Sequence, residues 1–420
     1  MPEQALYDLS PLLRLMLMGL LLALAPLAWV WLRQRQAPLA HRLRLLTLVT
    51  LFLTFDLVLF GAFTRLTDSG LGCPDWPGCY GSASPFGAHA EITLAQSAQP
   101  SGPVTHSKAW IEMIHRYLAT AVGVLILTLA ITTWLARRQS QLARPAPDAP
   151  DLPPLRLQNE RESSARRTRS DPRGGHLPIS FWWPLATLFW VCIQGAFGAL
   201  TVTMKLFPAI VTLHLLGGMV LLALLRAQAA RYAQAAGALV PEALPRAWRR
   251  LLLLTFALVW LQIALGGWVS TNYAVLACSD FPACQNSFWP AMDFRQGFTI
   301  WRELGAGPGG ENISFAALTA IHYVHRLAAY AVFAALLVLA FKLYERPAMR
   351  RHALWIGGLA LWQFATGLSN VVLGWPLLAA VSHTGGAAAL VIVLTGAIFS
   401  SRSAFDVLRV ARSRVSTLPA

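Results

Sequence analysis

The chain has 420 residues, of which 56% are hydrophobic and only 13% are charged, and its mean hydropathy is +0.51. Soluble domains are typically about a quarter charged, so this composition excludes a disordered chain, a collagen-like chain and a small disulfide-rich scaffold. It favours a polytopic membrane protein, in which the many aromatic side chains line two membrane interfaces.

Nine apolar stretches of about 20 residues predict nine membrane-spanning helices in an all-α fold. The first stretch could be an uncleaved signal anchor. Because no basic segment precedes it and no convincing cleavage site follows it, we interpret it as a ninth span. In chain order the stretches cover 10–32, 43–63, 111–136, 181–202, 208–226, 250–270, 318–342, 352–373 and 377–400.

The net charge of +15 is distributed very unevenly between the two sides of these helices. Loops on one side carry 26 of the 34 Lys and Arg residues, which predicts that this side is cytoplasmic. The charge is therefore explained by topology, and we predict no nucleic-acid partner. The Arg-rich segment 140–175 is predicted to be a disordered cytoplasmic linker; RNA binding there is the less favoured alternative.

An internal repeat divides the chain into two halves. Each half is predicted to be a bundle of four helices, and the basic linker is an insertion in the first. The matched motifs are Cys73–Cys79 with Cys278–Cys284 at an offset of 205, Ile114-His115-Arg116 with Val324-His325-Arg326 at 210, and Gln194 and His214 with Gln363 and His383 at 169.

The repeat and the apolar pattern together predict four segments. They are an extra N-terminal helix with its connector at 1–42, a first four-helix half at 43–226 that includes the linker 137–180, a second half at 227–402, and a cytoplasmic tail at 403–420.

Four histidines lie at similar depths in these helices, two in each half. His115 and His214 belong to the first half, and His325 and His383 to the second. Two imidazoles on different helices of a four-helix bundle are the requirement for a bis-histidine heme site. An isolated intramembrane histidine more often serves as an interhelical hydrogen bond, but the repeated pairing favours heme ligation.

Three arginines are candidates for binding heme propionates near the non-cytoplasmic surface. Arg116 and Arg326 each follow a predicted ligand, and Arg65 lies in the first outer loop. A guanidinium in a membrane helix is costly without a partner, and a propionate would supply one. Snorkelling to lipid headgroups is an equally good alternative.

The two cysteine pairs lie in loops on the non-cytoplasmic side. In an oxidising compartment, Cys73 with Cys79 and Cys278 with Cys284 are predicted to form disulfides. A zinc site is less favoured, because it would need two more ligands, and only His89 and His106 are available near the first pair. Cys192 lies within a predicted helix, where we expect it to be packed.

Glu112 marks a departure from the repeat. It precedes His115 by three residues, whereas His322 precedes His325 by the same spacing. This spacing places the carboxylate on the same helical face as His115, where it could relay protons or stabilise a positive charge. The alternative is a carboxylate that faces water. Asp56 is a further membrane acid without an assignable role.

The sequence resembles the heme A synthase family over about residues 43–400. The resemblance rests on the run from Gly61 to Cys73, on Glu112-Met-Ile-His115-Arg116, and on His214-Leu-Leu-Gly-Gly and Ser382-His383-Thr-Gly-Gly. It implies an eight-helix core of two four-helix halves. It also implies that the first-loop cysteines matter for activity.

This resemblance further implies a division of labour between the halves. The first half would bind the substrate, heme O, between His115 and His214, and Glu112 would be a catalytic carboxylate. The second half would hold a permanent heme b between His325 and His383. The implied reaction oxidises the C8 methyl of heme O to a formyl group, giving heme A for cytochrome oxidase assembly.

The expected location is the bacterial inner membrane, with the cysteine loops in the periplasm and the linker and C-terminus in the cytoplasm. Expected partners are membrane lipids, the heme O synthase (a farnesyltransferase) and an unidentified electron donor. Two other functions explain the histidines. A b-type electron-transfer cytochrome gives Glu112 no task, and a heme transporter or assembly chaperone would bind heme reversibly.

Overall fold

The computed structural model describes residues 10–142, 181–307 and 309–403. Its nine long helices correspond to the nine predicted spans, so the all-α prediction is confirmed. Their bounds are α1 Ser10–Arg33, α2 Leu39–Leu66, α4 His106–Leu142, α6 Trp182–Thr203, α7 Pro208–Ala235, α8 Arg246–Thr271, α10 Phe315–Tyr344, α11 Arg350–Val372 and α12 Leu377–Phe399.

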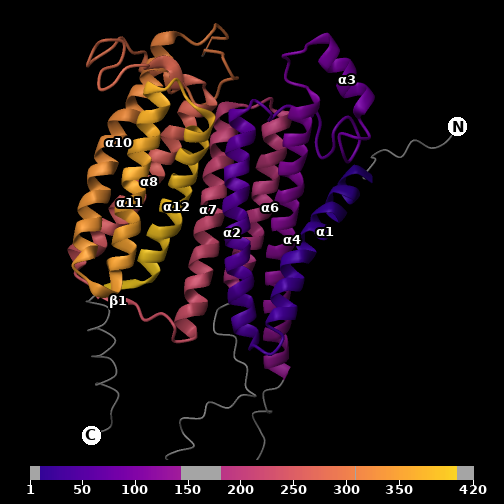
Figure 1. Cartoon of the computed structure of the whole chain (residues 1–420), viewed down its shortest axis with the longest axis vertical. Helices are drawn as coiled ribbons and strands as arrows, with labels where there is room; N and C mark the ends of the chain where they lie inside the picture. Colours follow the sequence, from indigo (N-terminus) through magenta and orange to yellow (C-terminus); the bar gives the residue numbers. More distant parts are fainter. Residues whose placement is uncertain (1–9, 143–180, 308, 404–420) are drawn as a thin grey trace, which may run out of the picture.

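The eight long helices after α1 form two rings of four, which lie side by side in Figure 1. In the first ring, α2 packs on α4, α4 on α6, α6 on α7 and α7 on α2. The second ring repeats this order with α8, α10, α11 and α12. The rings meet where α12 packs against α7 and α2, and where α7 packs against α8.

Helix α1 lies outside the first ring and runs obliquely along α4 (Figure 1). A close approach makes this contact possible: a Cβ at Gly19 would lie 2.4 Å from the Thr120 side chain. Leu15, near the start of α1, is buried together with the first cysteine pair. The extra helix therefore covers both the first bundle and its outer loop.

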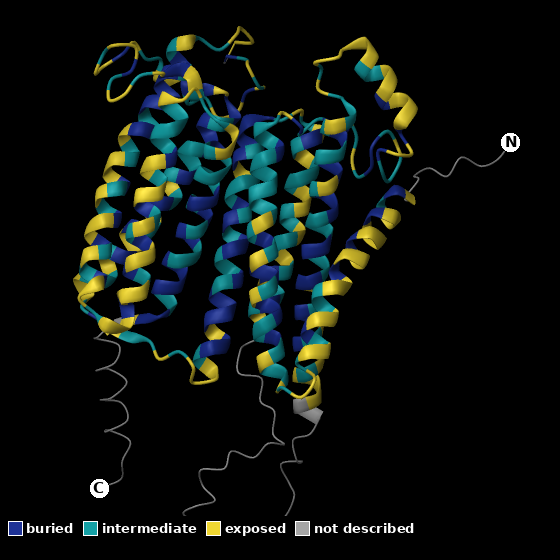
Figure 2. Ribbon diagram, viewed as in Figure 1, coloured by how far each residue is buried: buried dark blue, intermediate teal, exposed yellow. Residues whose placement is uncertain are grey.

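The helices expose apolar side chains outward and bury the faces that meet inside the rings (Figure 2). This pattern fits lipid as the surrounding solvent. Eight of the described helices are long and apolar enough to cross a membrane. Of the nine long helices, α11 is the one that does not meet this criterion of apolarity; its sequence contains the polar residues His352, Gln363 and Asn370.

The connections contain short elements that the apolar pattern did not predict. They are α3 (His89–Ala98), η1 (Ala274–Ala277), α9 (Phe294–Gly297), η2 (Pro347–Met349), and a parallel pair of strands, β1 (Glu242–Leu244) and β2 (Ser401–Ser403). The strand pair joins the start of α8 to the end of α12 at the end of the molecule opposite the cysteine loops (Figure 1). Most of the predicted linker, and the tail after 403, lie outside the described residues.

Candidate functional site

The four predicted histidine ligands lie on helices at opposite corners of their rings. In the first ring His115 is on α4 and His214 on α7, and in the second His325 is on α10 and His383 on α12. Each bundle can therefore present two nitrogens from opposite sides of its interior, which is what ligation on both faces of a porphyrin requires.

The depths of these histidines match more closely than the sequence suggested. Because α4 and α10 begin earlier than predicted, His115 is the tenth residue of its helix and His325 the eleventh of its own. His214 and His383 are each the seventh residue of α7 and α12. Matched depth in both halves follows directly from the repeat.

Each histidine faces a glycine on a neighbouring helix, and the part these four glycines play was not predicted from the sequence. A Cβ at each position would come 3.0–3.4 Å from the ring, so a larger residue would crowd the imidazole. The pairs are His115 with Gly61, His214 with Gly198, His325 with Gly266, and His383 with Gly367. Their spacings repeat the offsets of 205 and 169, which is the signal that could have revealed them.

A glutamine on the preceding helix fixes the backbone of the second ligand in each half. Gln194 Nε2 donates to the His214 carbonyl at 2.9 Å, and Gln363 Nε2 donates to the His383 carbonyl at 2.8 Å. A Cβ at Gly217, three residues after His214, would lie only 1.9 Å from Gln194. A glycine at this position therefore leaves the space that the Gln194 side chain occupies. These contacts position α7 and α12 at matching heights.

Glu112 is buried, with only 4% of its surface exposed, and it does not face water. Its Oε1 pairs with Arg116 Nη2 at 2.5 Å, and its Oε2 accepts a hydrogen bond from the backbone N–H of Cys73 at 2.8 Å. The carboxylate is thus held between α4 and the first cysteine loop. In the second half His322 is also buried, with its Nδ1 3.0 Å from the Ala274 carbonyl oxygen.

Arg116 and Arg326 each bind backbone carbonyl oxygens of the cysteine loop in their own half. Nη1 of Arg116 donates to Asp75 and Gly78, and Nη1 of Arg326 donates to Asp280 and Ala283. These acceptors are related by the offset of 205. The structure therefore gives both guanidinium groups protein partners, and propionate binding by these arginines stays a prediction.

The cysteines pair as predicted, Cys73 with Cys79 and Cys278 with Cys284. Each loop is closed further by a repeated aspartate. The carboxylate of Asp75 accepts from the N–H groups of Tyr80 and Gly81, and Asp280 accepts in the same way from Gln285 and Asn286. Both loops therefore have the same construction above their histidines.

Arg65 joins the two halves at the level of these loops. Its Nη2 donates to the Ser270 carbonyl at 2.7 Å, and its Nη1 lies 2.9 Å from the Tyr273 hydroxyl, which donates to Asp68 at 2.6 Å. Burial raises the pKa of Tyr273, so this hydroxyl keeps its proton for that hydrogen bond. Arg65 thus bridges α2 and the end of α8, and propionate binding by it also stays a prediction.

Four side chains have environments that bear on other interpretations. The prediction that Cys192 is packed is wrong, because it is exposed on α6. Asp56 is exposed on α2. The rings of His89 and His106, the possible zinc ligands near the first loop, lie 4.6 Å apart. Within the described residues, however, no group of three or more potential metal ligands comes together.

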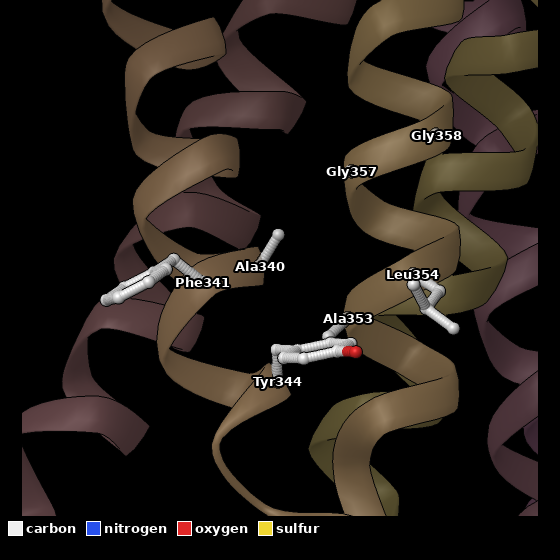
Figure 3. A pocket seen from close by; sticks show the side chains of 7 residues that line it. All are labelled: Ala340, Phe341, Tyr344, Ala353, Leu354, Gly357 and Gly358. Carbon is white, nitrogen blue, oxygen red and sulfur yellow. The ribbon is translucent and has the colours of Figure 1, made fainter.

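An apolar groove lies between α10 and α11 near the end opposite the cysteine loops, and Ala340, Tyr344 and Gly357 are among its lining residues (Figure 3). Its volume is about 310 Å³. Ala340 follows His325 by 15 residues, which is roughly four helical turns. The groove is therefore separate from the histidine sites.

Comparison with known proteins identifies the family of this chain. Residues 44–395 match a family described as cytochrome oxidase assembly protein. The heme A synthase of Shewanella oneidensis is 36% identical over 353 residues, covering 82% of this chain and 92% of that protein. The heme A synthases of Caulobacter vibrioides and Halalkalibacterium halodurans are each 25% identical, covering 82% and 77% of this chain and 91% and 85% of their own. Since the family match spans most of the chain, the protein belongs to the heme A synthase family of cytochrome oxidase assembly proteins.

Proposed function

We propose that this protein is an oxidoreductase that converts heme O to heme A. The observation that carries the proposal is the repeated pair of histidines on opposite corners of each ring, each facing a glycine. The residues present fit a heme in each half, because two imidazoles from different helices can hold a heme iron between them, and the glycines keep the neighbouring backbones close to the rings. In this proposal His115 and His214 bind heme O, and His325 and His383 hold a resident heme b.

The resident heme b would supply electron transfer when bound. The protein groups around the substrate have separate tasks. Oxidation of a methyl to a formyl group must remove protons from the reacting carbon, and Glu112 is the buried carboxylate nearest in sequence to a substrate ligand. Held by Arg116 and by the Cys73 N–H, it can accept or hold a proton in a fixed place. The first cysteine loop, which touches this carboxylate, would then help to position it.

We further propose that the protein lies in the bacterial inner membrane with both cysteine loops in the periplasm. The charge asymmetry of the sequence supports this orientation, as does the presence of disulfides at the end that would face an oxidising compartment. Heme O would come from the heme O synthase, a membrane farnesyltransferase. The product would pass to cytochrome oxidase assembly. Conversion of a methyl to a formyl group removes four electrons and adds one oxygen atom, so an oxidant such as O2 would be consumed; each hydroxylation of that kind would take two electrons from a donor and reduce the second oxygen atom to water.

Pigment analysis tests the proposed activity. The full-length protein is supplied to a bacterial strain that makes heme O but no heme A, and hemes B, O and A are separated by chromatography. We expect heme A, or its hydroxylated precursor, with the wild-type chain, and neither with His115→Ala at equal membrane abundance. Membranes that contain the wild-type protein, bind heme and yet yield no oxidised heme O would contradict the enzyme and favour a cytochrome or a carrier.

A further inference from the structure

The two halves surround their histidine rings with different side chains. In the second half, a polar group contacts Nδ1 of each histidine: Thr366 Oγ1 lies 2.9 Å from His383 Nδ1, and Gln262 Nε2 lies 3.0 Å from His325 Nδ1. The repeat offsets of 169 and 205 place Phe197 and Leu57 at the equivalent positions of the first half. Both polar partners are therefore replaced by apolar residues.

Thr366 fixes which nitrogen of His383 carries the proton. Its hydroxyl donates to the Trp362 carbonyl oxygen at 2.8 Å, so its oxygen is left to accept from His383 Nδ1–H. The lone pair of His383 is then on Nε2, the nitrogen available for a metal. A partner on the far nitrogen orients a ligating ring and raises its basicity, and losing such a partner typically weakens metal binding.

Gln262 restrains the other ring of the second half. Its amide nitrogen also donates to the His325 carbonyl oxygen at 3.1 Å, so the side chain ties α8 to α10 at the ligand. Its Oε1 is buried and, among the described residues, has no hydrogen-bond partner. As it stands, the amide nitrogen faces Nδ1. An amide turned by 180° would place Oε1 toward Nδ1–H of a metal-bound His325 and would give up the bond to the His325 carbonyl.

The first half lacks this support. Among the described residues, the buried His214 Nδ1 has no hydrogen-bond partner. Phe197 packs instead beside the apolar cluster around Phe207. The nearest ring atoms also differ, since Gly198 faces Cε1 and Nε2 of His214, whereas Gly367 faces Cε1 and Nδ1 of His383. His115 packs against the Phe60 ring, with the centroids 6.3 Å apart.

We propose that Thr366 and Gln262 are positioning residues that make the second-half heme permanent, and that Leu57 and Phe197 leave the first-half ligands weak enough for heme to exchange. The inference rests on the proposed function, because only an enzyme with a heme substrate needs one site that retains and one that releases. A bond to Nδ1 strengthens the iron–imidazole bond in one half. Its absence in the other lets substrate enter and product leave.

The first arm of the test measures heme b in the purified full-length protein. Heme transfer to excess apomyoglobin gives the release rate, and a redox titration gives the midpoint potential. We expect Thr366→Val to release heme b about 10–100-fold faster and to raise its midpoint potential, because the ligand donates less electron density. Thr366→Ser keeps the hydroxyl and should restore both values.

Thr395→Val is the matched control for this arm. It makes the same chemical change on α12, at a buried hydroxyl that has no partner among the described residues. It should leave release and potential unchanged. Thr366→Val with the release rate and potential of the wild-type protein would overturn the assignment, because a hydroxyl that merely packs in the bundle would alter neither.

The second arm builds the missing partner into the first half. Phe197→Thr should slow the release of bound heme O or heme A to the same acceptor by about 10–100-fold, while Phe197→Leu should not. The heme b content of each variant reports whether the protein is folded, and the Thr366 arm stays decisive if a Phe197 variant does not fold. Unchanged release from a folded Phe197→Thr would overturn the exchange half of the proposal.

The outcomes separate this inference from the proposed function. A protein that makes no heme A in the pigment assay, yet releases heme b faster after Thr366→Val, would contradict the enzyme and support the role of Thr366. If the wild-type protein makes heme A and Thr366→Val releases heme b at the wild-type rate, the result would support the enzyme and contradict the role of Thr366.

Discussion

The two halves share a scaffold and differ in the side chains near the histidines. Both have histidines on opposite corners of a four-helix ring, a glycine against each ring, and a disulfide loop held by an arginine. The first half adds a buried carboxylate, Glu112, where the second has His322. The second half adds Thr366 and Gln262 beside its ligands.

This comparison separates two kinds of information in the sequence. Residues that repeat set the distance between helices and the height of the histidines, and so form the proposed heme sites. Residues that depart from the repeat are the ones proposed to decide what happens to the heme there. The proposed chemistry therefore depends on a few positions, and changes there can be checked against the equivalent positions in the other half.

The largest effects are expected from the ligands themselves. His325→Ala or His383→Ala should remove the low-spin heme b from the purified protein, because each takes away one of the two proposed heme ligands. His115→Ala should keep heme b but abolish heme A formation. Absorption spectra of the purified protein and chromatography of extracted hemes measure the two results.

His322 provides the control for these ligand variants, because it lies one helical turn from His325 and is a possible substitute ligand. His322→Gln alone should retain heme b. If both His325→Ala and His383→Ala keep the wild-type low-spin spectrum, the assignment of the second-half ligands is wrong.

Glu112→Gln is expected to have the next largest effect. The change preserves volume and leaves an oxygen that can accept from the Cys73 N–H, but it removes the negative charge. General acid–base groups contribute about 10²–10⁴-fold to rate, so heme O or a hydroxylated intermediate should accumulate in pigment extracts while heme b stays bound. The equivalent change His322→Gln should leave heme A output nearly unchanged.

Loss of the ion pair with Arg116 could also act through the first loop rather than through chemistry. Arg116→Lys separates the two, because it keeps a cation beside Glu112 and removes the forked contacts with the loop carbonyls. A catalytic carboxylate predicts that Glu112→Gln is the more damaging change. Equal losses in both variants would assign Glu112 to loop anchoring, and normal heme A output from Glu112→Gln would exclude a catalytic role.

Enlarging a repeated glycine should have an intermediate effect in either half. A Cβ at Gly61 would lie 3.0 Å from His115 Nε2, and one at Gly266 would lie 3.0 Å from His325 Cε1. Overpacking costs about 1–3 kcal/mol, equivalent to about 5–150-fold in affinity. Gly61→Ala should therefore weaken heme O binding and Gly266→Ala heme b binding, each measured by titration of the extracted protein with heme.

Gly198→Ala is the milder comparison, since its Cβ would lie 3.4 Å from His214, close to ordinary contact. Alanine favours a helix over glycine, so none of the three changes should reduce helix content. Equal heme affinity in Gly61→Ala and the wild-type protein would show that this close approach does not restrict the ligand.

The helices, the repeat and the disulfide pairs were predictable because each leaves a periodic or spaced signal in the sequence. The environment of Glu112 was not. Its spacing from His115 predicted a shared helical face, but only the fold shows that the Cys73 N–H and Arg116 enclose its carboxylate. Similarly, α3 has no apolar run long enough to mark it, and the exposure of Cys192 depends on which face of α6 meets the bundle.

The partners of the arginines show the same limit. The sequence indicated that Arg116 and Arg326 need anionic or polar acceptors. Their acceptors are backbone carbonyl oxygens, which every residue has, so the residue types could not identify them. The glycines and Thr366 were within reach of sequence reasoning, because the repeat offsets align them with their counterparts. Their contacts with the histidine rings, however, are seen only in the fold.

The smallest effects are expected from the cysteines, and they compare the loops with the bundles. Each disulfide closes a loop of only six residues of separation, so its loss should lower global stability by only about 2 kcal/mol. Alkylation of membranes without reductant should leave all four loop cysteines unlabelled. Cys192, exposed to lipid in the middle of α6, should react with a maleimide only after denaturation, because the thiolate is the reactive form and apolar surroundings disfavour it. Cys192→Ser should abolish this labelling and leave both hemes in place.

The two loops should differ in function. The double variant Cys73→Ser with Cys79→Ser should lower heme A output, because Cys73 contacts Glu112. The double variant Cys278→Ser with Cys284→Ser should leave heme A output unchanged. Equal losses in the two double variants would mean that the loops act only as covers for the bundles, and the first loop would then have no special part in placing the carboxylate.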